Sequence, residues 1–370
     1  MNIKPASWTV GHPCINNKIK PSQDKAVEID KSNFIHREEV FGTLLYPKSA
    51  GPTYQGGYFI ENEYSGTMIL NAPVRLDIEL TYQCYHNCIH CYLPNKKNVH
   101  MDKNMAIELL HEAKEINVIG VQFIGGEPYC YPHIVELVDI AKKLGLKVEI
   151  FTSAFGIKKD NILATRDFLD RVAISLDGSL SIHNAFRGHA KSYDSVLEAI
   201  DLFTGHSSFT SVATVVTRLN VDEIPFIYNI VNKLGVDSLE LNAFKAVGQG
   251  MSISKYHIPF NELVGIIENK ISSLEGTTQI RKPDILYTVG KFTFFGCGSR
   301  TFTAVINPFG NLLRCNFVRK DYGNISDMGL KKLWNYSNQV KLSQLAPKCK
   351  SCLYQNRCGG FCDLHKINKV

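Results

Sequence analysis

No segment of this 370-residue sequence is apolar for long enough to cross a lipid bilayer, which takes about 20 consecutive apolar residues in a helix. The first eighteen residues, MNIKPASWTVGHPCINNK, also lack the continuous apolar core of a secretory signal peptide. These two absences argue against a membrane partner and against secretion. The sequence therefore predicts a cytoplasmic protein.

Long runs of a single charge are absent as well. Lys and Arg together number 41 and Asp and Glu 35, so the net charge of +6 is spread along the chain. Nucleic-acid-binding proteins usually concentrate positive charge on one face or one segment. We therefore expect no nucleic-acid partner. Internal repeats and low-complexity segments are missing too, and a chain of this length favours one large α/β domain with smaller additions.

Three regions are predicted from the distribution of apolar segments and turn residues. Residues 1–73 place turn formers between short apolar segments such as EVFGTLLY and GYFIENEY, which predicts a small β-rich N-terminal segment. Residues 74–285 alternate short apolar strands with amphipathic helices, a pattern typical of a parallel sheet. Residues 286–370 return to short strands, turns and cysteines, and we interpret them as a separate C-terminal domain.

The middle region contains six strand candidates. They are RLDIEL, VIGVQFI, KVEIFT, RVAISL, TSVATVVT and SLELNAF. Between them, residues 131–145 and 192–205 each carry an apolar stripe at helical spacing and end in glycine. Six such units on one curved sheet predict a partial (β/α)6 barrel, in which chemistry gathers at the C-terminal ends of the strands.

Cysteine, by contrast, is plentiful, with eleven residues. In a reducing cytoplasm, clustered thiols bind metals more often than they form disulfides. Three lie in LTYQCYHNCIHCYLP after the first strand, two stand apart, and six lie near the C-terminus, so we expect two metal-binding regions. In chain order, the eleven are Cys14, Cys84, Cys88, Cys91, Cys130, Cys297, Cys315, Cys349, Cys352, Cys358 and Cys362.

The three-cysteine loop has two interpretations. With His86 or His90 as a fourth ligand, it would form a closed structural zinc site. Alternatively, the three thiolates hold a four-iron cluster and leave one iron open to an external ligand. The second strand leads to Gly125, Gly126 and Glu127, which allow close backbone approach and supply a carboxylate beside that iron. This neighbouring loop favours the open cluster.

Taken together, these motifs resemble the radical S-adenosylmethionine enzymes. Their signature is three cysteines separated by three and then two residues, with an aromatic residue or histidine before the third, where His90 lies here. The cluster loop, GGEP and SLDG follow in the same order over roughly residues 74–285. The resemblance implies that Cys84, Cys88 and Cys91 bind a 4Fe-4S cluster whose open iron is chelated by S-adenosylmethionine. An electron from a donor such as flavodoxin or ferredoxin would then generate a 5'-deoxyadenosyl radical.

The same resemblance implies a cofactor site at the strand ends. It would place glycines and a glutamate at the methionyl group, two serines and an aspartate at the ribose, and a histidine at the adenine. The alternative is that the serines are strand-end caps and Asp177 belongs to an ordinary turn. We interpret Arg187 and Gly188 as loop structure. The implied cofactor residues are His90, Gly125, Gly126, Glu127, Ser153, Ser175 and Asp177.

The C-terminal cysteines include the segment CKSCLYQNRCGGFC, which on its own could be a zinc knuckle. Beside the core described above, their order resembles the SPASM extension, which carries auxiliary 4Fe-4S clusters. The seventh cysteine of that pattern is absent after Cys362, so the resemblance implies one or two auxiliary clusters. It groups Cys297 with Cys315 and Cys362, and Cys349 with Cys352 and Cys358, where Asp363 or His365 could complete the second set.

The resemblance also implies a substrate class. Enzymes with this extension modify ribosomally synthesised peptides or proteins, so we expect a precursor peptide that is cross-linked, epimerised or cut at its backbone. Residues 34–70 resemble the strands of peptide-recognition domains but lack their helices, so a separate recognition protein is an alternative to a simple β-rich addition.

Other functions remain open from the sequence. One is maturation of a protein such as a sulfatase, another is dehydrogenation of a small molecule, and a more distant one is a zinc-dependent binding module.

Cys130, three residues after Glu127, has two interpretations. It is either an inert buried thiol or a hydrogen-atom donor to a substrate radical, as a peptide epimerase requires.

Overall fold

The computed structural model describes residues 34–39, 42–48, 58–61, 70–93, 98–206, 209–283, 286–289, 292–295 and 302–343. The lone Cys14 lies outside these residues, as do several predicted or candidate ligands: Cys297, Cys349, Cys352, Cys358, Cys362, Asp363 and His365. No helix in the described part of the chain is long and apolar enough to cross a membrane.

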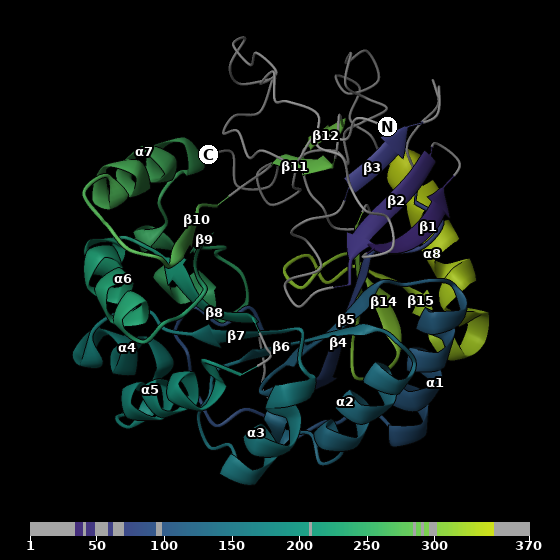
Figure 1. Cartoon of the computed structure of the whole chain (residues 1–370), viewed down its shortest axis with the longest axis horizontal. Helices are drawn as coiled ribbons and strands as arrows, with labels where there is room; N and C mark the ends of the chain where they lie inside the picture. Colours follow the sequence, from purple (N-terminus) through teal and green to yellow (C-terminus); the bar gives the residue numbers. More distant parts are fainter. Residues whose placement is uncertain are drawn as a thin grey trace.

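The main feature of the fold is a ten-stranded sheet with the order β10-β9-β8-β7-β6-β5-β4-β13-β14-β15 (Figure 1). The six predicted strands lie next to one another in it and run parallel, which confirms the partial barrel. They are β4 (Arg75–Thr81), β5 (Gly120–Gly125), β6 (Lys147–Thr152), β7 (Arg171–Ser175), β8 (Phe209–Val216) and β9 (Ser238–Ala243).

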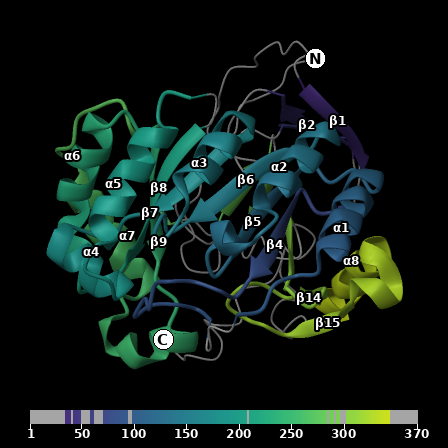
Figure 2. The ribbon, with the colours of Figure 1, turned by 90° about the horizontal axis from the view of Figure 1, so that it is seen from below.

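Helices cover the outer face of this curved sheet, as Figures 1 and 2 show. Local signals explain where they begin and end: the Asp102 side chain accepts from the Met105 amide at 3.0 Å, and Gly188 ends a helix at φ 68°. The covering helices are α1 (Lys103–Glu115), α2 (Ile134–Lys143), α3 (Lys159–Thr165), α4 (Leu180–Arg187), α5 (Ser192–Phe203), α6 (Ile224–Lys233) and α7 (Phe260–Ile271).

The sheet extends beyond the six predicted strands at both ends. At one end β10 (Gln279–Arg281) pairs parallel with β9. At the other, β13 (Thr303–Ile306) pairs parallel with β4, and β14 (Asn311–Leu313) and β15 (Asp321–Asn324) continue antiparallel. β13, β14 and β15 therefore belong to the barrel sheet, and the domain boundary near residue 285 stays a prediction.

Two smaller sheets and a last helix complete the described fold. The predicted β-rich N-terminal segment contains β1 (Phe34–Glu39), β2 (Gly42–Pro47) and β3 (Tyr58–Glu61) in an antiparallel sheet of order β1-β2-β3. β11 (Leu286–Val289) pairs antiparallel with β12 (Phe292–Phe295) in a separate two-stranded sheet. Helix α8 (Ile325–Ser343) lies beside α1 (Figure 2).

A buried arginine ties the N-terminal sheet to the barrel. Arg37 of β1 pairs with Glu39 at 2.6 Å and donates to the carbonyl oxygens of Ala72 and Pro73 at 3.0 and 2.9 Å. Because Arg37 is buried, these partners replace the water that its guanidinium would otherwise require. The N-terminal sheet is thereby fixed to the segment that enters β4.

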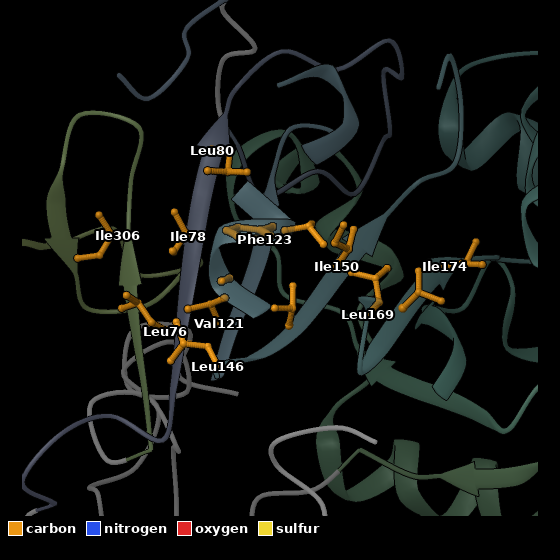
Figure 3. Packing of buried hydrophobic residues seen from close by; sticks show 14 of the residues in the cluster. Leu76, Ile78, Leu80, Val121, Phe123, Leu146, Ile150, Leu169, Ile174 and Ile306 are labelled. Carbon is orange, nitrogen blue, oxygen red and sulfur yellow. The ribbon is translucent and has the colours of Figure 1, made fainter. Parts of the chain in front are cut away.

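The barrel strands alternate between an apolar outer face and a polar inner face. In β4, Leu76, Ile78 and Leu80 pack under the helices (Figure 3), while Asp77 and Glu79 occupy the opposite face. Parallel strands buried on both faces usually read as continuous apolar runs. The alternation here indicates that the barrel encloses a polar interior.

Ion pairs neutralise the charges of that interior. The Arg171 guanidinium lies 3.1 Å from Glu149 Oε2 and 2.6 Å from Glu240 Oε1, so one cation bridges carboxylates of β6 and β9. Arg75 pairs with Asp77 at 2.6 Å. Burying a charge without a partner costs several kcal/mol, so the strands can close only with these pairs in place.

We expect Arg171→Met to destabilise the fold by about 3–5 kcal/mol, because it leaves two buried carboxylates without their shared cation. The matched control is Lys143→Met, which removes an exposed pair with Asp139 and should change stability by less than about 0.5 kcal/mol. Urea unfolding followed by circular dichroism measures both. Equal midpoints for the two variants would contradict the predicted role of the network.

Candidate functional site

A cavity of about 570 Å³ lies inside the barrel. Its walls include residues from the three-cysteine loop, from the ends of several strands and from the segment after β14. Eight of the residues predicted from the sequence line this single cavity: Cys84, Cys88, His90, Cys91, Gly125, Gly126, Ser153 and Ser175. The structure thus brings together groups that are spread over 92 positions of the sequence, from 84 to 175 inclusive.

The three-cysteine loop is held mainly through its backbone. The Cys91 amide donates to the Cys88 carbonyl at 3.2 Å, which closes a turn inside the loop. The Asn87 and Ile89 amides donate to the carbonyls of Arg187 and Phe186 at 3.0 and 2.9 Å. The middle of the loop is therefore fixed to the C-terminal end of α4.

Among the described residues, no three His, Cys, Asp or Glu side chains lie close enough to hold one metal ion together. A 4Fe-4S cluster has a different requirement, because each cysteine binds its own iron. Three cysteines on the wall of one cavity, with soft thiolate donors, fit such a cluster. When bound, the cluster supplies the electron for reductive cleavage of S-adenosylmethionine.

The two glycines of GGEP let that loop lie directly against residues 81–83, which lead into the three-cysteine loop. A Cβ on Gly125, where φ is 140°, would lie 2.2 Å from the Thr81 carbonyl oxygen, and one on Gly126 would lie 2.2 Å from the Gln83 oxygen. The Gly126 amide donates to Thr81 at 2.6 Å. Any side chain at either position would push the two loops apart.

Glu127 lies beneath the cavity wall. Its carboxylate accepts from Thr152 Oγ1 at 2.7 Å, from Ser153 Oγ at 2.6 Å and from the Ser153 amide at 2.8 Å. Burial raises the pKa of Glu127 although these donors oppose the shift. Glu127 is absent from the described lining, whereas Ser153 is part of it. Its contact with the cofactor stays a prediction, and its visible role is to orient Ser153.

Asp177 is likewise covered, in this case by Arg187, which the sequence analysis interpreted as loop structure. Arg187 Nε and Nη2 lie 2.7 and 2.6 Å from Asp177 Oδ2, while Nη1 reaches Cys88 Sγ at 3.8 Å. Burial would raise the pKa of Asp177, but the Arg187 guanidinium, together with His90, His183 and the Val215 amide, outweighs burial and the pKa is lowered. Arg187 lines the cavity, and Asp177 is not among its described lining residues. The sequence signal that could have identified this contact is the RG dipeptide at the end of α4, Arg187 and Gly188.

A neutral histidine, His183, holds the backbone of Asp177 in the Asp177–Arg187 pair. His183 Nδ1 accepts from the Asp177 amide at 3.1 Å, and Nε2 lies 2.9 Å from Ser192 Oγ. Burial lowers the pKa of His183 to about 4, and the nearby Arg187 adds to the shift. An uncharged imidazole thus accepts the Asp177 amide hydrogen and fixes the turn after β7.

Cys130 ends the short helix η2 (Pro128–Cys130) and is not among the described residues that line the cavity. Burial raises the pKa of its thiol to about 12, and the charges of Glu127 and Cys84 contribute. The thiol therefore stays protonated near neutral pH. A role as hydrogen-atom donor remains a prediction from the sequence.

Comparison with known proteins agrees with this geometry. The radical SAM superfamily matches residues 78–230, and the iron-sulfur cluster-binding domain SPASM matches residues 297–353. Mycofactocin maturase MftC of Mycobacterium tuberculosis is 27% identical over 314 residues, which cover 79% of this chain and 79% of that protein. The subtilosin biosynthesis protein AlbA of Bacillus subtilis is 26% identical over 326 residues, covering 82% and 70%.

The structure of Streptococcus suis SuiB bound to precursor peptide SuiA superposes with a TM-score of 0.73. It covers 91% of this chain and 95% of that one at 18% identity, so it supports the fold. Fold and site together define an enzyme built to hold an iron-sulfur cluster at the mouth of a partial barrel. The chain thus carries a radical SAM domain over residues 78–230 and a SPASM domain over residues 297–353.

We expect acid to destabilise the protein partly through His183. Because its folded pKa is lowered from 6.5 to about 4, its contribution to stability is complete above pH 6.5 and declines as the pH falls toward 4. The loss is on the order of 3 kcal/mol. His183→Asn keeps an acceptor for the Asp177 amide and should flatten this part of the curve.

Thermal unfolding of iron-free protein between pH 7 and pH 4 measures the effect, since acid-labile clusters then play no part. His206→Asn is the control, because that histidine is partly exposed and pairs with an exposed Asp167. Parallel curves for wild type and His183→Asn would show that another group causes the acid sensitivity.

Proposed function

We propose that this protein is a radical SAM/SPASM enzyme that abstracts a hydrogen atom from a ribosomally synthesised precursor peptide and thereby modifies it. The observation that carries the proposal is the single cavity lined by Cys84, Cys88 and Cys91 together with Ser153 and Ser175. The names of the relatives support the substrate class: one matures mycofactocin, one acts in subtilosin biosynthesis, and SuiB was solved with a precursor peptide.

Each group on the cavity wall has a proposed task. The three cysteines hold the radical SAM cluster, and Gly125 and Gly126 leave room for the methionyl group of S-adenosylmethionine. Ser153 and Ser175 offer hydroxyls to the ribose, and His90 packs at the adenine. Arg187 places a cation beside Cys88, and such a donor stabilises negative charge on thiolate and cluster.

We propose one or two auxiliary clusters in the C-terminal region. Cys315 is the predicted auxiliary ligand that the structure describes, and its Sγ accepts from the Val318 amide at 3.1 Å. Backbone N–H groups directed at cysteine sulfur are among the features that set the potential of iron-sulfur clusters. The remaining ligands stay those predicted from the sequence, Cys297, Cys349, Cys352, Cys358 and Cys362.

Peptide recruitment is proposed to involve the N-terminal sheet. In the described sheet β1 and β3 are edge strands, and an extended peptide can add to such an edge through backbone hydrogen bonds. Arg37 holds this sheet to the entry of β4, so a peptide docked there would lie near the barrel. A separate recognition protein is the alternative, and a flavodoxin or ferredoxin is the proposed electron donor.

Asn316 is a proposed contact for the substrate. It lines the cavity, and its Oδ1 atom is buried without a hydrogen-bond partner among the described residues. A buried acceptor of this kind costs stability unless a ligand or water satisfies it. An N–H group of a bound peptide would do so.

The central test is S-adenosylmethionine cleavage by anaerobically purified, iron-reconstituted protein with reductant. We expect 5'-deoxyadenosine from the wild type and none from the Cys84→Ala, Cys88→Ala, Cys91→Ala variant, because the cluster is then lost. Liquid chromatography quantifies the product. Zinc in place of iron, with no cleavage, would overturn the proposal in favour of a binding module.

Substrate class is tested separately, with the precursor peptide encoded nearest to the gene and deuterium at its candidate positions. Transfer of deuterium into 5'-deoxyadenosine identifies the peptide as the hydrogen donor, and mass spectrometry of the peptide then identifies the change. A cross-link removes two hydrogen atoms, whereas epimerisation leaves the mass of an unlabelled peptide unchanged. Turnover with a sulfatase or a small alcohol, and none with peptide, would support the other functions.

We expect Asn316→Ala to raise the KM for the peptide about tenfold while cleavage of S-adenosylmethionine without peptide is unchanged, since one hydrogen bond to substrate is lost. The control is Asn338→Ala, because Asn338 bonds within α8 at Trp334 and does not line the described cavity. An unchanged KM for Asn316→Ala would remove this residue from the substrate site.

A further inference from the structure

Both ends of the three-cysteine loop converge on one ion pair, whose carboxylate is buried and whose cation is partly exposed. Glu79 points inward at the end of β4, and none of its side chain is exposed. Tyr92, which follows Cys91, places its hydroxyl 3.2 Å from Glu79 Oε1 and 3.3 Å from the Gly125 carbonyl oxygen. Tyr82, two residues before Cys84, accepts from the cation that pairs with Glu79.

That cation is Arg319, from the segment between β14 and β15 and 240 positions away from Glu79 in the sequence. Its Nη1 and Nη2 donate to the two carboxylate oxygens of Glu79 at 2.7 and 2.8 Å, a bidentate fork. Its Cζ lies 5.5 Å from the ring centre of Tyr82 and 5.9 Å from that of Tyr92. Arg319 thus contacts a residue on each side of the three cysteines: Tyr82 before Cys84 and Tyr92 after Cys91.

The same segment carries a predicted auxiliary ligand. Cys315 lies four residues before Arg319, and a tight turn joins it to Val318: the Cys315 amide donates to the Val318 carbonyl at 3.2 Å, and the Val318 amide donates to Cys315 Sγ. Phe317, between them, lines the cavity and packs edge-on against Tyr92 at 5.9 Å. Arg319 is therefore rigidly linked to a second cysteine-bearing loop.

We propose that the Glu79–Arg319 ion pair is a joint that fixes the three-cysteine loop and the Cys315 loop relative to each other. Arg319 acts as a positioning residue, and its charge also neutralises Glu79 close to the cysteines. The inference rests on the cluster-binding role proposed above for both loops. Loss of Arg319 has two separate consequences. Tyr82 and Tyr92, which flank the three cysteines, lose their shared partner, and the buried Glu79 carboxylate is left without its cation.

The experiment compares three variants in the full-length, iron-reconstituted protein: Arg319→Met, the double variant Glu79→Gln/Arg319→Met, and Arg218→Met. The last is the control, because Arg218 forms a 2.9 Å pair with Glu262 in which both side chains are largely exposed. Hydrogen–deuterium exchange of residues 82–92 reports positioning. Redox titration of the radical SAM cluster by electron paramagnetic resonance reports charge, and 5'-deoxyadenosine formation reports the reaction.

For Arg319→Met we expect faster exchange in residues 82–92, a more negative midpoint potential, and about tenfold slower cleavage of S-adenosylmethionine, because misplaced reacting groups lower rates steeply. The double variant should recover the wild-type potential, since the buried charge is gone, but keep the fast exchange. Arg218→Met should match the wild type in all three measurements. Circular dichroism confirms that each variant is folded.

If a folded Arg319→Met protein showed the wild-type exchange rate in residues 82–92 and the wild-type midpoint potential, the proposal would be overturned. If Arg319→Met fails to fold, the double variant decides, because it contains no unpaired buried charge and must still show fast exchange in residues 82–92. Failure of the proposed function looks different: the wild type itself forms no 5'-deoxyadenosine. The exchange measurement still tests the joint in that case, since it requires no turnover.

Discussion

Buried charge has to be paired, and this requirement organises the molecule from the floor of the barrel to its mouth. At the floor, Arg171 bridges carboxylates of two strands. Near the strand ends, Arg187 pairs with Asp177, and Arg319 pairs with Glu79. Each arginine restores favourable interactions that its partner carboxylates lose on leaving water.

Two of these cations also contact the three-cysteine loop or the residues that flank it. Arg187 reaches Cys88 Sγ from the end of α4, and Arg319 reaches the stems of the loop from the segment after Cys315. The loop itself has little regular structure, so its shape depends on groups donated by distant parts of the chain. A loop held in this way can keep its geometry while its own side chains remain available for chemistry.

Local signals account for what the sequence predicts well. All six parallel strands and the close approach at Gly125 and Gly126 could be read from apolar periodicity and from glycine chemistry. The contact of Arg187 with Cys88, the pairing of Arg319 with Glu79 and the pairing of β13 with β4 could not, because these partners lie about a hundred to more than two hundred positions apart. Glu127 shows a subtler limit: its motif is visible in the sequence, but its orientation toward Ser153 requires three dimensions.

The parallel pairing of β13 with β4 has a consequence for biosynthesis. β4 carries the cysteine loop, yet one of its edges stays unpaired until residues 303–306 have left the ribosome. Arg319 emerges later still, so the loop gains its contact with this residue only after residue 319 has left the ribosome. Iron delivered during translation would meet an unfinished loop. The topology therefore makes the finished cysteine loop depend on residues that are made long after it.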